Sequence, residues 1–360
     1  MTPTVTHPRP TATGGRRALR VARRVAPLAL VVALAGIALP RMARFSEVWP
    51  AIAAMGWPAA ALLGAATVWN LVSYAFVLAA ATPGLTRSQA MVVTQSSTAV
   101  ANTVPGGGAL GVGVMAGMYR SWGFSASTTS LAALSTGVWN TFAKLGLPVL
   151  AVALLAVSGD ASWGRLVGAG VGVAVVAAAV VLTARMVRDD RLARRVASAC
   201  QRIVTGGRRA LRRGPVQDWA ERASRVRGDA EELVRGCWIR LTVTTVLSQL
   251  SACAVLFLAL RGVGVSASSV GWTEVLAAFA FVRLLALVPL SPGGVGVVEV
   301  GLSAALVSAG AERGPAVAAV LVFRTLTYLA PIVAGVPAYL VWKRRSAWRR
   351  PLLTAAVAVA

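Results

Sequence analysis

Two short stretches decide the fold of this chain: Asn102-Thr103-Val104-Pro105-Gly106-Gly107-Gly108 and Ser291-Pro292-Gly293-Gly294-Val295-Gly296. Each interrupts an apolar run, and Pro and Gly end helices. Lipid cannot satisfy the backbone N–H and C=O groups that a broken helix frees, so such a break must be buried in protein or line a wet cavity. Paired breaks in corresponding positions of two halves indicate a transport site. We therefore predict a membrane protein whose substrate site lies at both breaks and includes Asn102, Pro105, Gly106, Gly107, Pro292, Gly293 and Gly294.

The composition supports a membrane protein. Hydrophobic residues make up 57% of the 360 residues, charged residues make up 13%, and the mean hydropathy is +0.70. A soluble chain carries roughly 25% charged residues. The net charge of +24 comes mainly from three basic blocks outside the apolar runs, at residues 9–24, 185–240 and 343–350. Because no DNA-binding motif accompanies these blocks, we expect anionic membrane lipids as partners and no nucleic acid.

Cysteine and histidine argue against metal and triad chemistry. The three cysteines, Cys200, Cys237 and Cys253, have no paired metal-ligand spacing. The single histidine, His7, lies in the Pro/Thr-rich start of the chain. We therefore expect no cofactor, no histidine metal site and no Ser-His-Asp triad.

Six apolar segments approach or exceed the roughly 20 residues that a membrane span needs: 25–40, 57–82, 126–157, 163–184, 237–260 and 316–342. They predict one transmembrane domain over residues 25–345. Residues 1–24 form a disordered basic tail in this interpretation, residues 185–236 a basic cytoplasmic linker between two halves, and residues 346–360 a C-terminal tail.

The basic blocks also constrain the topology, because positive residues beside spans mark the cytoplasmic side. If all three blocks are cytoplasmic, the segment 88–120 must start and end inside, with Arg87 and Arg120 at its base. The segment 273–310 must start and end outside. We therefore predict an all-α polytopic protein of the cell membrane, with about six full spans, two opposed re-entrant hairpins in an inverted repeat, and both termini in the cytoplasm.

Ionisable residues inside the apolar segments are candidates for the site, since each costs at least ~2.5–3.5 kcal/mol at membrane depth. Glu299 follows the second break, where the helix dipole favours an acid, and we expect it to pair with Arg324. Two interpretations stay open. The pair can simply fix the hairpin against the span, or Arg324 can bind an anion when Glu299 is displaced or protonated.

Other polar residues also lie within the apolar segments. Lys144 is the sole lysine before the C-terminal block and is included among the substrate-binding candidates. Arg283 is expected near the outer interface, with its side chain extending toward water. For Gln95, Asn102 and Asn140, the expected role is to satisfy backbone that the first break frees.

The half-helices at the breaks also present N-termini, which are ready anion sites. A phospholipid or polyprenyl-phosphate headgroup is an anion attached to an apolar tail. Anion sites at depth in an apolar protein therefore fit a lipid substrate, and they also fit a small organic anion.

Two sets of motifs resemble one known family. The first is the run Leu287-Val288-Pro289-Leu290-Ser291-Pro292-Gly293-Gly294-Val295-Gly296-Val297-Val298-Glu299, followed by Arg324-Thr325-Leu326-Thr327-Tyr328 and Pro331. The second is the first break, followed by Arg120 and Gly123. Together they resemble the lysylphosphatidylglycerol synthase transmembrane region, over roughly residues 25 to 345.

The resemblance implies lipid translocation. In multiple peptide resistance factor proteins, this region is implicated in flipping aminoacylated phosphatidylglycerol to the outer leaflet. The same motif adds Tyr328 to the substrate-binding candidates. Those proteins carry a soluble aminoacyl-transferase domain after the membrane region, and this chain, which ends at Ala360, has no room for one. It is therefore not expected to synthesise lysylphosphatidylglycerol by itself, or to be an enzyme.

Three functions remain open at this point. The favoured one is flippase-like translocation of an anionic or aminoacylated phospholipid, or of a polyprenyl-phosphate-linked lipid. The second is a lipid-phosphate transferase, for which Asp189-Asp190 is the one adjacent acidic pair on a basic segment. The third is a non-catalytic membrane partner of a separate lipid-modifying enzyme, bound through residues 185–236.

Overall fold

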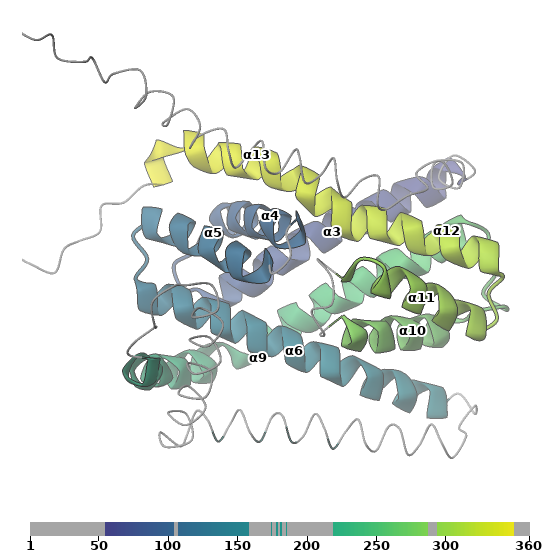
Figure 1. Cartoon of the computed structure of the whole chain (residues 1–360), viewed down its shortest axis with the longest axis horizontal. Coiled ribbons are helices and arrows are strands. Elements are labelled where there is room, and N and C mark those ends of the chain that lie inside the picture. Colours follow the sequence, from purple (N-terminus) through teal and green to yellow (C-terminus); the bar gives the residue numbers. More distant parts are fainter. Residues whose placement is uncertain are drawn as a thin grey trace, which may run out of the picture. The chain divides into compact units, whose positions relative to one another are not determined.

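The computed structural model describes four ranges, together with four single positions between 174 and 185: 55–103, 107–157, 219–286 and 294–348. Within these ranges every regular element is a helix (Figure 1). This agrees with the predicted all-α fold. Several predicted segments lie wholly or mostly outside the described residues: 1–24, 25–40, 163–184, 185–236 and 346–360. The total of six spans and the two tails therefore stay predictions.

Four long helical runs have apolar parts of 25, 30, 27 and 32 residues, each long enough to cross a membrane. They are α3 (Trp57–Ala81), α6 (Ala126–Val157), α9 (Trp219–Gly262) and the continuous run of α12 (Arg313–Arg324), η2 (Thr325–Leu329) and α13 (Ala330–Arg344). These runs coincide with four of the predicted spans, 57–82, 126–157, 237–260 and 316–342.

The helix α9 begins earlier than the sequence predicted. The linker was expected to continue to residue 236, but the helix begins at Trp219 and continues to Gly262, and its apolar part begins at Gly236. A change from charged to apolar composition does not end a helix, because Arg, Glu, Ala and Leu all favour helical backbone. The end of the predicted linker is therefore continuous with the span.

Two pairs of shorter helices lie on either side of the two breaks. The first hairpin consists of α4 (Arg87–Thr103) and α5 (Gly107–Ser121), and the second of α10 (Trp272–Leu285) and α11 (Val297–Ser308). At 1.5 Å per residue these helices are about 25 Å long or less, which is short of a hydrocarbon core of about 30 Å. Arg87 and Arg120 lie at the same end of the first hairpin, as predicted.

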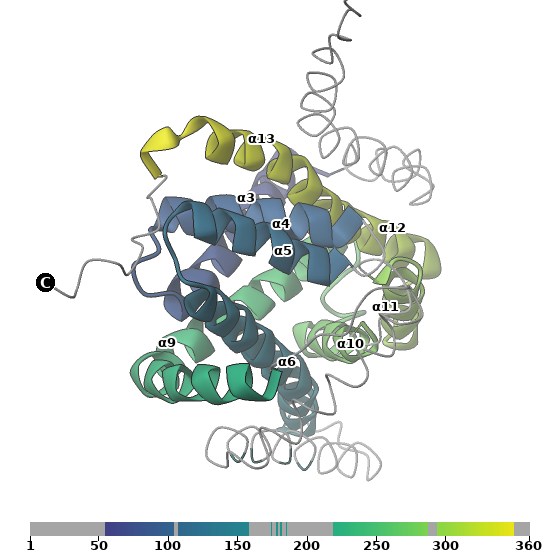
Figure 2. The ribbon, with the colours of Figure 1, turned by 60° about the vertical axis from the view of Figure 1, so that its left-hand side comes forward.

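Glycine allows the two helices of the first hairpin to approach closely. A Cβ atom on Gly111 would lie 2.8 Å from the carbonyl oxygen of Ser97, and one on Gly107 would lie 2.3 Å from that of Ala101. Moving along α5 from Gly107 to Gly111, the facing residue moves back along α4 from Ala101 to Ser97, so the two helices run antiparallel. Both views show them side by side (Figures 1 and 2).

Each helix hairpin packs against the last long helix of the other predicted half. The first spans of the halves, α3 and α9, pack against each other. In the first hairpin α4 packs on α13, the end of the second half, and in the second hairpin α10 packs on α6, the end of the first half. When the chain is divided into the two predicted halves, corresponding helices therefore make corresponding contacts.

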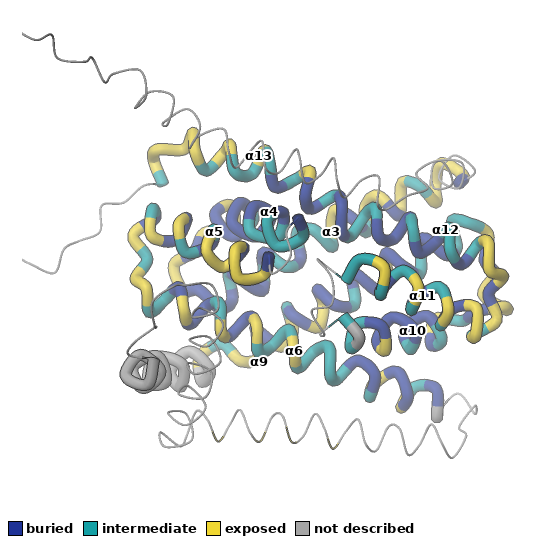
Figure 3. The backbone as a smooth tube through the Cα atoms, in the orientation of Figure 1, coloured by how far each residue is buried: buried dark blue, intermediate teal, exposed yellow. Residues whose placement is uncertain are grey.

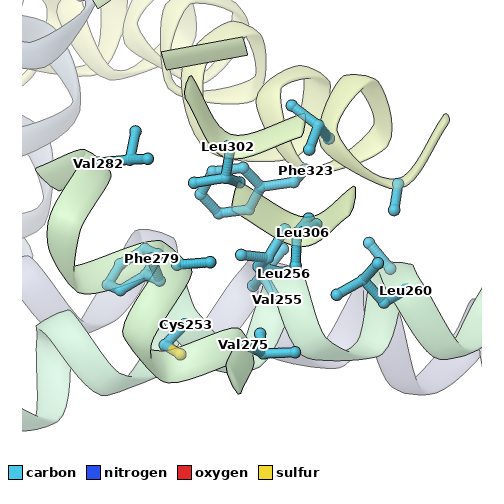
Figure 4. Packing of buried hydrophobic residues seen from close by; sticks show 14 of the residues in the cluster. Cys253, Val255, Leu256, Leu260, Val275, Phe279, Val282, Leu302, Leu306 and Phe323 are labelled. Carbon is cyan, nitrogen blue, oxygen red and sulfur yellow. The ribbon is translucent and has the colours of Figure 1, made fainter. Parts of the chain in front are cut away.

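A hydrophobic cluster joins α9, α10, α11 and α12 (Figure 4). Phe279 of α10 and Phe323 of α12 meet edge to face with ring centroids 6.2 Å apart, and Leu302 of α11 is buried beside them. Since lipid tails are as apolar as these side chains, the cluster holds the helices by close packing rather than by removal from water. It fixes Arg324, next to Phe323, opposite the helix that carries Glu299.

The long helices carry exposed residues on their outward faces (Figure 3), and many of these residues are apolar. Examples are Trp69 on α3, Leu134 on α6, Leu247 on α9 and Val333 on α13, which are 48–65% exposed. Apolar surface of this extent marks a protein that lies against lipid or a partner.

Candidate functional site

The predicted ion pair between Glu299 and Arg324 is present. The Nε atom of Arg324, the last residue of α12, donates to Oε1 of Glu299 at 2.7 Å. The two side chains are 8% and 18% exposed, respectively. A charged pair held out of water in this way loses hydration. Removal of either partner would therefore leave the other as an uncompensated buried charge.

Glu299 also caps the half-helix that follows the second break. Its Oε2 atom accepts a hydrogen bond from the backbone N–H of Gly296 at 2.6 Å. Gly296 precedes the first residue of α11 with φ of +88°, a conformation that glycine adopts without strain. One carboxylate therefore satisfies an orphan N–H at the positive end of a helix and pairs with Arg324.

Tyr328 connects the same arginine to the first break. The guanidinium carbon of Arg324 lies 4.6 Å from the centroid of the Tyr328 ring. The Tyr328 hydroxyl donates to the backbone oxygen of Asn102, and the Asn102 Nδ2 atom donates to the backbone oxygen of Tyr328 at 3.3 Å. Asn102 lies at the end of α4, just before the first break. We call this continuous set of contacts the break-to-break network; it comprises Asn102, Tyr328, Arg324, Glu299 and Gly296.

The network passes through a π-helical turn that sequence reasoning missed. Residues Thr325–Leu329 form η2, in which the N–H of Ala330 donates to the carbonyl oxygen of Thr325, five residues earlier. Pro331 has no N–H to give to the preceding turn and its ring crowds that turn, so the widened turn accommodates it. Such turns inside α-helices are frequent at functional sites. The proline beside the Arg324–Tyr328 motif was the available signal.

A second polar cluster lies on three other helices. Nη2 of Arg283 (α10) donates to Oε1 of Gln249 (α9) at 2.7 Å, and Nε2 of Gln249 donates to Oδ1 of Asn140 (α6) at 2.5 Å. Lys144 follows Asn140 by four residues and so lies on the same face of α6. The positive charges of Lys144 and Arg283 act on each other, as do those of Arg283 and Arg324. The structure therefore places Lys144 one turn along α6 from this second cluster.

Arg283 lies in the last turn of α10, beside the second break, and donates to Gln249 of α9. Its expected place near the outer interface stays a prediction. Gln249 itself was not predicted, because a single glutamine in an apolar run carries no distinctive spacing.

Two of the three amides expected to satisfy the first break bond elsewhere. Nε2 of Gln95 donates to the carbonyl oxygen of Leu71 in α3 at 2.7 Å, and Asn140 accepts from Gln249. Asn102 bonds to backbone as expected, but the backbone belongs to Tyr328.

The breaks themselves are only partly described. Gly107 is buried against α4, and Gly294 has φ of +71°. Four of the predicted site residues lie outside the described residues: Pro105, Gly106, Pro292 and Gly293. Of the predicted set, the structure brings Asn102, Tyr328, Arg324 and Glu299 into direct contact.

Polar side chains also lie between other helices. Between α3 and α9, Asn70 donates to Ser251 at 2.8 Å and Ser73 donates to Ser248 at 3.0 Å. On α4, the hydroxyls of Thr94 and Ser96 are buried and have no hydrogen-bond partner among the described residues. Buried polar atoms are normally paired with protein or water, so these two hydroxyls are candidates for water-mediated contacts. In the same described part of the chain, no three His, Cys, Asp or Glu side chains gather as ligands for a metal ion.

Comparison with known proteins agrees with the resemblance seen in the sequence. The family model of the lysylphosphatidylglycerol synthase TM region matches residues 24–335. No curated protein matches the chain. With its long apolar helices, the chain is a membrane protein of this lipid-related family. It belongs to the lysylphosphatidylglycerol synthase transmembrane region family.

Proposed function

We propose that this member of the lysylphosphatidylglycerol synthase transmembrane region family translocates a lipid between the two leaflets, with the headgroup passing through the break-to-break network. The substrate class is an anionic or aminoacylated phospholipid, or a polyprenyl-phosphate-linked lipid. The observation that carries the proposal is the pairing of a buried Arg324 with Glu299 where both helix breaks converge.

The chemistry of this pair suits reversible binding of a phosphate. Arg presents a planar fork that matches phosphate oxygens with two parallel hydrogen bonds. A lipid phosphate that takes the place of Glu299 on Arg324 keeps the buried cation paired at each moment. Glu299 keeps a favourable position at the N-terminus of α11 during the exchange. Arg324 is therefore paired in both states, with Glu299 when no lipid is bound and with the phosphate when lipid is bound. A transporter needs two such states of similar free energy.

The exchange of helix partners supports the predicted inverted repeat. Corresponding contacts of α4 with α13 and of α10 with α6 are those expected if two related halves are built around α3 and α9. Hairpin helices too short to cross a bilayer support re-entrant hairpins, and the charge blocks support their entry from opposite faces. Such a protein can open its central site to one leaflet at a time.

The apolar outer faces fit the other end of the substrate. Val300 on α11 and Val333 on α13 are 71% and 65% exposed, and both belong to helices that meet the network. A lipid can keep its tails in the bilayer along such faces while only the headgroup enters the polar interior. This arrangement avoids burying the acyl chains in the protein.

The test is a translocation assay with the full chain in proteoliposomes. Lipids with fluorescent short tails are placed in both leaflets, and a membrane-impermeant quencher measures how fast inner-leaflet label reaches the outside. We expect faster loss of inner label than in protein-free liposomes, and a return toward that background in Arg324→Gln. Background rates for every lipid class would reject the proposal. Restored activity of a separate lipid-modifying transferase by the same protein would then favour the partner role.

A further inference from the structure

The net charge of the interior side chains limits the charge of the headgroup that can bind there. The interior cations Lys144, Arg283 and Arg324 come from three different elements, α6, α10 and α12. Arg283 donates to Gln249, and Gln249 donates to Asn140, one turn from Lys144. Arg324 lies on α12, which packs against α9, the helix that carries Gln249. Each of the three side chains is buried or partly buried.

The described residues supply little negative charge to balance these cations. Residues 57–157 contain no acidic residue, and between residues 236 and 348 the described acidic side chains are Glu274, Glu299 and Glu312. The side chains of residues 219–235 lie outside those that the structure describes. Glu274 precedes Arg283 by nine residues of α10, about 13 Å along the helix, and Glu312 precedes Arg324 by twelve residues, about 18 Å. Among the described residues, Lys144 and Arg283 form no ion pair.

The sequence of the two breaks adds no charge. Residues 104–106 are Val-Pro-Gly and residues 287–293 are Leu-Val-Pro-Leu-Ser-Pro-Gly, with no charged residue in either. Three cations and one carboxylate therefore leave the described site with a net charge of about +2. Buried charge of this size requires a compensating anion, because an isolated charge at low dielectric is strongly unfavourable.

We propose that the site selects a lipid phosphomonoester, a headgroup that carries close to two negative charges, over phosphodiester lipids and over aminoacylated lipids. The inference rests on the proposed function and narrows its substrate class. A phosphomonoester carries about −1.5 to −2 at neutral pH, against about −1 for a phosphodiester. A lysyl ester on phosphatidylglycerol adds positive charge, which the three cations repel. Arg324 binds the phosphate as a fork, while Lys144 and Arg283 balance its second charge.

The experiment compares three lipids with identical labelled tails: phosphatidic acid, phosphatidylglycerol and lysylphosphatidylglycerol. Translocation is measured in proteoliposomes, and binding is measured separately as the rise in melting temperature of the detergent-solubilised full chain. In both measurements we expect phosphatidic acid to be favoured over phosphatidylglycerol on the order of tenfold, and lysylphosphatidylglycerol to be the poorest. Glycerol 3-phosphate, a soluble phosphomonoester, should bind weakly; equal binding would show that a free phosphate rather than a lipid is recognised.

Charge variants supply an independent check. Lys144→Gln should narrow the preference for phosphatidic acid over phosphatidylglycerol, because it removes one unit of positive charge. Arg313→Gln removes a cation at the exposed start of α12 and should leave the preference unchanged. The comparison of lipids on the unaltered protein needs no variant, so misfolding of Lys144→Gln would not remove the test.

The outcomes separate the two proposals. Translocation of all three lipids at the same rate, or fastest translocation of lysylphosphatidylglycerol, would overturn the charge inference and leave translocation intact. If no lipid moves but phosphatidic acid stabilises the protein most, selection by charge stands and the transport function fails. Absence of both movement and binding preference would overturn both.

Discussion

At the residue scale, one carboxylate connects two structural tasks. Glu299 pairs with Arg324 and caps α11 through Gly296. A side chain with both tasks couples the state of the arginine to the start of a half-helix. A movement of Glu299 away from Arg324 therefore also alters its hydrogen bond to Gly296 at the start of α11. The proposed mechanism relies on this coupling.

The ion pair can be tested by removing its charges singly and together. Glu299→Gln and Arg324→Gln should each lower the free energy of unfolding by roughly 3–5 kcal/mol, because a lone buried charge remains. The double variant removes both charges and should recover much of that stability. We expect it to fold and not to translocate lipid, since Arg324 is absent. A folded double variant with near-normal translocation would remove the pair from the mechanism and leave it a purely structural role.

Tyr328→Phe isolates the contact with the first break. The ring can still lie beside Arg324, but the hydroxyl bond to the backbone oxygen of Asn102 is lost. An unsatisfied buried acceptor costs about 1–3 kcal/mol, and we expect slower translocation because the two breaks are no longer joined. The control is Tyr119→Phe, which removes a buried hydroxyl bond to Thr82 at 2.9 Å, at the base of the first hairpin. Its stability should fall by a similar amount; equal loss of translocation in the two variants would argue against a specific role for Tyr328.

At the element scale, small residues decide which helices can meet. A Cβ atom on Gly335 of α13 would lie 2.2 Å from the Ala99 side chain of α4 and 2.8 Å from the Gln95 carbonyl oxygen. Close approach of backbones through small residues is the usual way membrane helices associate. Gly335 therefore holds the end of one half against the hairpin of the other.

Gly335→Ala should loosen this contact. A methyl group there must push α13 away from α4, and overpacking of this kind costs about 1–3 kcal/mol. The matched control is Gly137→Ala in α6, where a Cβ atom meets nothing within 4 Å and alanine should favour the helix slightly. Melting of the two variants in the same detergent checks the prediction. A Gly335→Ala protein as stable as the control would show that the helices separate at little cost.

At the scale of the whole molecule, the two hairpins should open to opposite sides of the membrane. The motivation is the distribution of basic blocks together with the corresponding contacts of the two halves. Exposed Ser88 lies at the base of the first hairpin, and exposed Ser268 lies just before the second. In a protein without Cys200, Cys237 and Cys253, Ser88→Cys should react with an impermeant thiol reagent only from the cytoplasm. Ser268→Cys should react only from outside, and the same sidedness at both positions would contradict the inverted repeat.

Much of the architecture followed from the sequence because membranes impose simple rules. Length and apolarity located the helical runs at 57–82, 126–157 and 316–342 to within a few residues, since a span needs a minimum apolar length. The glycine-rich breaks located both helix pairs, because Pro and Gly end helices. An acid just after a break and an arginine in the next apolar run predicted the pair of Glu299 and Arg324, because neither charge is tolerated alone at depth.

The tertiary structure decided what composition does not encode. The partners of Arg283, Gln95 and Asn140 depend on which helices pack together, and similar apolar helices carry little sequence signal for that choice. The same packing joins Asn102 to Tyr328, residues 226 positions apart, through a π-helical turn that forms where Pro331 meets its neighbours. The sequence by itself therefore determined the four long helical runs, the breaks and the charged candidates. Only the packing of the helices decided that both breaks converge on Arg324, because that convergence arises from contacts between distant segments.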